Sequence, residues 1–198
     1  MTFQQYFEEK FAFTGSGSKA IEGEKWATTD GSWWTYGFVY NVKDKTVGPH
    51  PGSLADLPDE YFVTHDVYSI TLEKTYSKDP SSPIHNIAKS YPDIVKTEPY
   101  FWTSFESYDW GSKSISSQSP QSRRPARLIL QTVIAALDLK VKPSDNICFS
   151  AAQNDTSRVS LYKVLANQYA NQHGKQVITK SYKTDSNDSE PEVYFFVR

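Results

Sequence analysis

Three arginines at the start of an expected helix are the residues best suited to hold a phosphate group. Arg123 and Arg124 precede Pro125, and Arg127 follows it within the first turn. Guanidinium groups form paired N–H bonds with phosphate oxygens, and a helix N-terminus adds a favourable dipole. Proline suits the first helical position. These arginines form either an anion clamp or a solvated group beside a polar loop, and the sequence leaves both interpretations open.

The second candidate for chemistry is the stretch of residues 146–183. Ile147–Phe149 is a short apolar run of the kind that a covered strand shows. From Thr156 onward the apolar residues recur at helical spacing, and one face collects Val159, Tyr162, Leu165, Ala166 and Tyr169. Asp155 or Thr156 suits the start of this helix, and Gly174 suits its end. The pattern predicts a buried strand, a capped helix and a second strand.

This strand, loop and helix resemble the third quarter of the GNAT family of N-acyltransferases. The residues that match are Asn154, Ser157, Leu161 and Tyr162. In that family the asparagine and the helix contact the pantetheine end of acetyl-CoA, and the tyrosine acts as general acid toward the departing thiolate. The resemblance therefore implies cofactor contacts for Asn154 and Ser157 and an acid role for Tyr162. Helical periodicity alone makes Tyr162 a core residue instead.

The same resemblance places the pyrophosphate loop of a GNAT enzyme, Arg/Gln-x-x-Gly-x-Gly/Ala, at residues 121–126. Gln121 and Arg124 match in type, and Ala126 stands for the last small residue, but the stretch contains no glycine. Pro125 also lacks an N–H group, so Arg123 and Arg124 would have to hold acetyl-CoA through their side chains. Glu106, on the expected strand before this loop, lies where such an enzyme could place a carboxylate to deprotonate an amine.

A looser resemblance concerns small uncharacterised proteins of tailed phages. These proteins pair a Ser-Arg-x-x-Leu-Tyr helix, matched by Ser157–Tyr162, with a final strand. The resemblance implies an accessory or inhibitor protein that binds another protein.

Composition excludes several classes of protein. A net charge of −2 provides no general attraction to duplex nucleic acid. The single cysteine, Cys148, cannot close a disulfide within the chain and indicates a reducing compartment. No apolar run approaches the roughly 20 residues that span a bilayer, and the N-terminus lacks the segments of a signal peptide. We therefore expect a cytoplasmic protein, in the host cytoplasm or the virion if it derives from a phage, without membrane contact.

Metal and cofactor sites are not expected. No metal-ligand spacing relates the four histidines, which are His50, His65, His85 and His173. Acetyl-CoA is the one cofactor in question, and only if the arginines form a clamp.

Aromatic residues make up 15% of the chain. Such residues fill cores, and they are also enriched where proteins meet partners. The sequence therefore leaves open whether the excess serves a dense core or an interaction face.

The expected order of elements predicts an α/β (α+β) fold with a mixed, mostly antiparallel sheet flanked by helices, of GNAT-like type and forming one domain over residues 1–198. We expect an N-terminal helix over residues 2–13 within an irregular arm that extends to residue 32, and aromatic-rich strands over 33–110. One of these strands covers 33–42 and alternates, with Trp34, Tyr36, Phe38, Tyr40 and Val42 on one face, and another lies within 61–74, with Phe62, Tyr68, Ile70 and Leu72 on one face. A flexible Ser-rich loop over 111–122 and a helix-strand-helix-strand-strand unit over 123–198 follow. Strands near 101–109 and 147–150 should be parallel neighbours, because the helix between them returns the chain to the same sheet. The predicted core includes Leu130, Val133, Ile147, Phe149, Leu161, Leu165 and Phe195.

Two classes of function remain. The first is a binding protein that keeps the fold without the chemistry and meets another protein through an aromatic surface. The second is an N-acyltransferase that uses acetyl-CoA with an arginine clamp. The missing loop glycines favour the first class, and whether the chain is an enzyme stays open.

Overall fold

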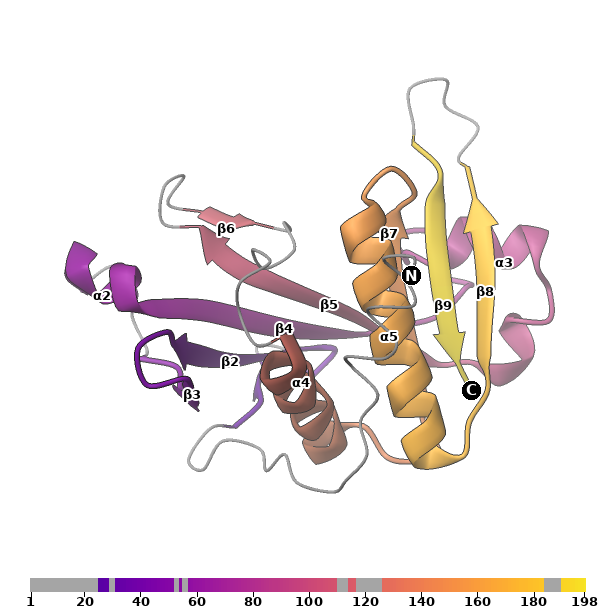
Figure 1. Ribbon diagram of the computed structural model, residues 1–198. Helices are drawn as coiled ribbons and strands as arrows, with labels where there is room; N and C mark the ends of the chain where they lie inside the picture. The colour runs from indigo at the N-terminus through magenta and orange to yellow at the C-terminus, as the bar shows by residue number, and fades with distance from the viewer. Residues whose placement is uncertain are drawn as a thin grey trace, which may run out of the picture. The chain divides into compact units, whose positions relative to one another are not determined.

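The computed structural model describes residues 25–28, 31–51, 54, 57–109, 114–116, 126–183 and 190–198. Its strands form one mixed, mostly antiparallel sheet in the order β1-β2-β4-β5-β7-β9-β8, in which β3 also pairs with β2 and β6 with β5 (Figure 1). The predicted fold class, a mixed sheet with helices, is therefore confirmed. The GNAT-like type stays a prediction.

The chain divides into two compact units. Unit 1 contains the described residues of 72–104 and 141–198, and unit 2 contains those of 16–71 and 105–140. The long strands β4 (His65–Thr75) and β5 (Tyr100–Asp109) contribute one part to each unit. The expectation of one domain and of its internal boundaries stays a prediction.

Unit 1 is built on strands β5, β7, β9 and β8. The bounds of these strands are β7 (Asn146–Ala152), β8 (Val177–Tyr182) and β9 (Glu192–Val197), and the helices of the unit are α3 (His85–Ser90), η1 (Val95–Thr97) and α5 (Thr156–His173). β5 and β7 pair in parallel from Tyr100·Asn146 to Trp102·Cys148, which confirms the predicted parallel neighbours. β7 pairs with β9 over a longer stretch, which reaches Ala152·Glu192. The pairing of β7 with β5 therefore ends at Cys148, whereas its pairing with β9 continues to Ala152.

Helix α5 covers one face of this sheet, as its sequence pattern predicts (Figure 1). The Asp155 side chain accepts a bond of 2.9 Å from the backbone N–H of Arg158, and Gly174 ends the helix in the left-handed region with φ 65°. The side chains that α5 buries are Leu161, Tyr162, Leu165, Ala166, Tyr169 and Ala170. The predicted core residues, which are Leu130, Val133, Ile147, Phe149, Leu161, Leu165 and Phe195, are all buried.

The opposite face of unit 1 carries a second apolar cluster. The cluster contains Ile84, Ile87, Ile94, Tyr100, Cys148, Tyr194 and Phe196. Cys148 is fully enclosed, and burial, followed by the charge of Glu192, raises the pKa of its thiol well above the usual value. A thiol that resists ionisation is a poor nucleophile, so Cys148 acts as a packing residue.

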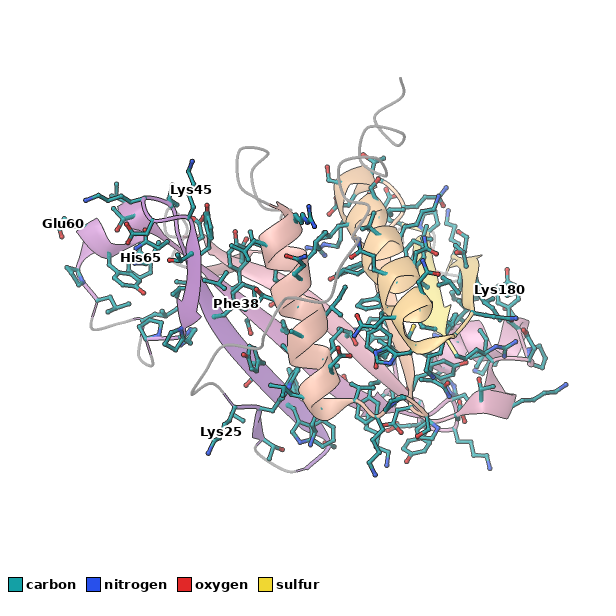
Figure 2. The ribbon with its side chains drawn as sticks, turned by 60° about the horizontal axis from the view of Figure 1, so that its bottom comes forward. Lys25, Phe38, Lys45, Glu60, His65 and Lys180 are labelled. Atoms are coloured by element: carbon teal, nitrogen blue, oxygen red, sulfur yellow. The ribbon has the colours of Figure 1, made fainter. Side chains whose placement is uncertain are left out.

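Unit 2 has an aromatic core of its own. Its elements are β1 (Ala27–Thr28), β2 (Trp33–Asn41), β3 (Thr46–Pro49), α2 (Asp59–Thr64), β6 (Ser114–Ser116), α4 (Ala126–Lys140) and its parts of β4 and β5. The expected alternation of β2 is confirmed, because Trp34, Tyr36, Phe38 and Tyr40 are buried. The centre of the Tyr68 ring lies 5.2 Å from the ring centre of Phe38, which is labelled in Figure 2, and 5.4 Å from that of Phe105. Trp26 Nε1 donates to the Ala136 carbonyl oxygen of α4 at 2.8 Å.

Three expected elements differ in extent. The strand that the pattern places within 61–74 begins only at His65, because residues 59–64 form α2, where Asp59 and Glu60 favour a helix start. The strand expected over 33–42 ends at Asn41, whose side-chain oxygen accepts bonds from the next turn at the N–H groups of Lys43 and Asp44. Residues 114–116, expected within a loop, instead pair with β5.

The helix expected over residues 2–13 and most of the loop expected over 111–122 lie outside the described residues. Among the residues that are described, no helix is both long enough and apolar enough to cross a bilayer.

Candidate functional site

The structure brings Asn154 and Ser157 together at the turn between β7 and α5. Both residues are exposed, and the Asn154 carbonyl oxygen accepts a bond of 3.0 Å from the backbone N–H of Thr156. The Asp155 carboxylate already occupies the helix cap between them, and the Arg158 Nε atom lies 3.5 Å from that carboxylate. The cofactor contacts that the resemblance implies for Asn154 and Ser157 stay predictions.

Tyr162 is a core residue of unit 1. Its side chain is 2% exposed, and its ring lies 5.4 Å from the ring of Phe149 on β7. A general acid has to come within hydrogen-bond distance of the group that it protonates. The ring of Tyr162 instead fills the packing between α5 and β7, as the periodicity predicts, and its acid role stays a prediction.

The other residues expected at an acyltransferase site belong to unit 2 or lie outside the described part. Glu106 is half-buried on β5, and Ala126 is the first residue of α4. Gln121, Arg123 and Arg124 lie outside the described residues. The arginine clamp therefore also stays a prediction.

A different set of side chains gathers on the face of unit 1 opposite α5. Residues that are directly opposite on paired strands project to the same side of the sheet. Cys148, Ser150 and Ala152 of β7 lie opposite Phe196, Tyr194 and Glu192 of β9, and on β8 the residues opposite these three are Ile178, Lys180 and Tyr182. Trp102 of β5 lies opposite Cys148 and shares this side. Sheet pairing thus brings together residues from four strands.

Burial decreases along this face. On β9 the exposed fraction is 0% at Phe196 and 6% at Tyr194, and Glu192 is only half-buried. Tyr91, Trp102 and Tyr182 pack against the edge of the buried cluster and are also half-buried. We name this region the Tyr194 surface, and its members are Tyr91, Trp102, Lys180, Tyr182, Glu192 and Tyr194.

The aromatic rings of the Tyr194 surface are held by specific contacts. The rings of Trp102 and Tyr194 meet edge to face with their centres 6.0 Å apart. The hydroxyl of Tyr91 donates to the Ser181 carbonyl oxygen at 3.2 Å. The Nζ atom of Lys180, which is labelled in Figure 2, lies 4.4 Å from the centre of the Tyr91 ring. These contacts fix the rings before any ligand arrives.

The Glu192 carboxylate acts on the Tyr194 hydroxyl beside it. Burial, and then the interaction with Glu192, raise the pKa of Tyr194 well above its usual value. The phenol therefore stays protonated beside the carboxylate. A carboxylate offers about four acceptor positions, so Glu192 has capacity for a donor from a ligand. No lysine or arginine in the described part of the chain forms an ion pair with it.

The arrangement suits binding by stacking and by charge. Aromatic faces attract cations, and the Glu192 carboxylate adds a negative charge beside them. No group of three or more His, Cys, Asp or Glu side chains is placed to hold a metal ion among the residues that the structure describes.

Sequence reasoning missed the Tyr194 surface as a site. The aromatic excess was its only signal, and alternation shows which residues of one strand share a side. Which strands become neighbours, and in which register, depends on sheet pairing. Comparison of the chain with protein-family models, with curated proteins and with solved structures finds no match, so the resemblances to GNAT enzymes and to phage proteins stay predictions.

Proposed function

We propose that the chain is a non-catalytic binding protein with a GNAT-like fold that holds another protein against the Tyr194 surface. The observation that carries this proposal is a set of half-buried aromatic side chains, Tyr91, Trp102 and Tyr182, which pack against a buried cluster. Tyrosine and tryptophan dominate the energetic centres of protein interfaces. Rings that are already ordered lose little side-chain entropy on binding, which favours affinity.

The position of Tyr162 supports the non-catalytic part of the proposal. Its burial between α5 and β7 accounts for the residue as packing, without an acid role. A phage-type accessory or inhibitor protein is a special case of the same function.

A photo-crosslinking experiment tests the proposal. Benzoylphenylalanine is placed at Tyr182, and in a control at Lys163, which is exposed on α5 on the opposite face of the sheet. We expect one defined protein from an extract of the source cells to crosslink at position 182 and not at 163, and the unlabelled native chain to compete with it. Equal crosslinking at both positions, or none at 182, would contradict the proposal.

An N-acyltransferase is the second candidate, and the early end of the β5–β7 ladder favours it. Pairing stops at Trp102·Cys148, and the slot for acetyl-CoA in the GNAT family lies where these two strands part. If the arginines form a phosphate clamp, acetyl-CoA should stabilise the chain by about 2.7 kcal/mol at a hundredfold excess over Kd. The melting temperature would then rise, and replacing Arg123 and Arg124 by Ala would abolish the rise. The binding-protein proposal predicts no rise at millimolar acetyl-CoA.

A further inference from the structure

On the Tyr194 surface the Glu192 carboxylate lies beside the protonated Tyr194 hydroxyl. Lys180 lies opposite Tyr194 on β8, one pair further along the same side of the sheet. Tyr182 lies directly opposite Glu192 on β8, and Ala152 lies opposite Glu192 on β7. Among the described residues Glu192 forms no ion pair. A half-buried carboxylate without a counter-ion keeps part of its desolvation cost uncompensated. A positively charged ligand would remove that cost.

The side chains on the β7 side of the carboxylate are small. Ala152 contributes only a methyl group there, and Ser150, opposite Tyr194, is also small. Tyr182 lies directly opposite Glu192 on β8, whereas Trp102 lies opposite Cys148 and meets this region through the contact of its ring with Tyr194. A flat cation on Glu192 would therefore lie next to Tyr182.

The surface already holds one cation in this manner. The Lys180 Nζ atom lies 4.4 Å from the centre of the Tyr91 ring, within the range of a cation–π contact. Lys180 thus lies over Tyr91 and makes no ion pair with Glu192 among the described residues. No lysine or arginine that the structure describes therefore neutralises the charge of Glu192.

We infer that the Tyr194 surface takes an arginine side chain of the partner protein, with its guanidinium group on the Glu192 carboxylate and its plane against Tyr182. This inference rests on the proposed binding function and names the group that is recognised. Arginine fits better than lysine because its planar guanidinium both stacks on rings and donates paired bonds to a carboxylate.

The test uses a pair of ligands that differ only in charge. Nα-acetyl-arginine amide is titrated against the full chain, and Nα-acetyl-citrulline amide, its neutral isostere, serves as the control. The readout is the indole N–H signal of Trp102 in a nitrogen–proton correlation spectrum, assigned with a Trp102→Phe variant. We expect a saturable shift with the arginine ligand, with affinity on the order of millimolar, and none with the citrulline ligand.

A matched pair of variants locates the charge. Glu192→Gln keeps the volume and removes the charge, and we expect it to weaken arginine binding by about tenfold. Glu190→Gln removes an exposed charge two residues earlier and should change the affinity by less than about twofold, because exposed charges are screened by salt. Equal shifts with both ligands, no shift with either, or full binding by Glu192→Gln would each overturn the inference.

The failure of this inference and that of the proposed function are distinguishable. If the crosslink at position 182 forms but the arginine ligand does not bind, the partner docks without an arginine and only the inference fails. If the arginine ligand binds but no partner crosslinks, the protein-binding function fails.

Discussion

Gly37 lies in the middle of β2, where an added methyl group should lower the stability of the fold because it would collide with His50. A Cβ atom built on Gly37 would lie 2.6 Å from Cδ2, 2.8 Å from Cγ and 3.0 Å from Cβ of His50. Separations this short require the imidazole of His50, or the strand, to move. Inserting a methyl group into a packed site costs about 1–3 kcal/mol, so we expect Gly37→Ala to lower the free energy of unfolding by that amount.

A second glycine of the same unit provides the control. Gly48 lies on β3, opposite Val39 of β2. A Cβ atom built on Gly48 would lie 3.7 Å from Val39 Cγ2, which is an ordinary van der Waals contact. Replacing a glycine by alanine without strain reduces the entropy of the unfolded chain, so Gly48→Ala should be neutral or stabilise the protein by about 0.4–1 kcal/mol. The two substitutions are chemically identical and should differ in sign.

Urea unfolding of four proteins measures the effect. The wild type, Gly37→Ala, His50→Ala and the double variant form a cycle in which the contact between the two side chains is isolated. We expect the double variant to be more stable than the sum of the single changes predicts, by about 1 kcal/mol or more, because the methyl group then meets no ring. Additive effects, or a Gly37→Ala variant as stable as Gly48→Ala, would refute the steric argument.

Three further predictions concern unit 1. Leu165 is fully buried, so Leu165→Ala should lower the free energy of unfolding by about 2–5 kcal/mol in a urea titration. Leu139 on α4 is 56% exposed, so the control Leu139→Ala should stay within about 0.5 kcal/mol of the wild type. Asp155→Ala removes the cap of α5 and should cost about 0.5–2 kcal/mol, and an unchanged urea midpoint would show that this cap is dispensable. The pKa of Tyr194 is raised in the folded state, so the folded chain retains a proton that the unfolded chain releases above its usual value of 10.0, and stability should fall as pH rises beyond that value. Urea midpoints at pH 8 and at alkaline pH should therefore diverge less in Tyr194→Phe than in the wild type.

Local sequence signals predicted correctly those helices and strands in which the spacing of apolar residues and the residues at the ends indicate the same structure. Helix α5 follows from the spacing of its apolar residues, from Asp155 at its start and from Gly174 at its end, all of which act within a few residues. Strand β2 follows from the alternation of large rings. The parallel pairing of β5 with β7 follows from the length of the helical connection between them.

Local signals misled where a neighbouring residue changed the backbone. Phe62 fits the alternation of a strand, yet residues 59–64 turn into α2. The strand begins at His65, which is labelled in Figure 2. Its ring stacks on that of Tyr61 with the ring centres 4.1 Å apart. A short apolar run is compatible with either structure, and such contacts decide between them.

Spacing along the chain was enough to predict α5 and β2 and which of their residues are buried, because these properties depend on residues that are close in sequence. The Tyr194 surface was decided by the tertiary structure alone. Trp102, Tyr182 and Glu192 are separated by up to ninety residues, and only the registers of β7, β8 and β9 place them on one side of a sheet. A shift of one residue in either ladder of β9 would move Glu192 to the α5 side or align it with different partners, because side chains alternate with a period of two. Register depends on all the contacts that a strand makes across the sheet, so it cannot be predicted from a short stretch of sequence.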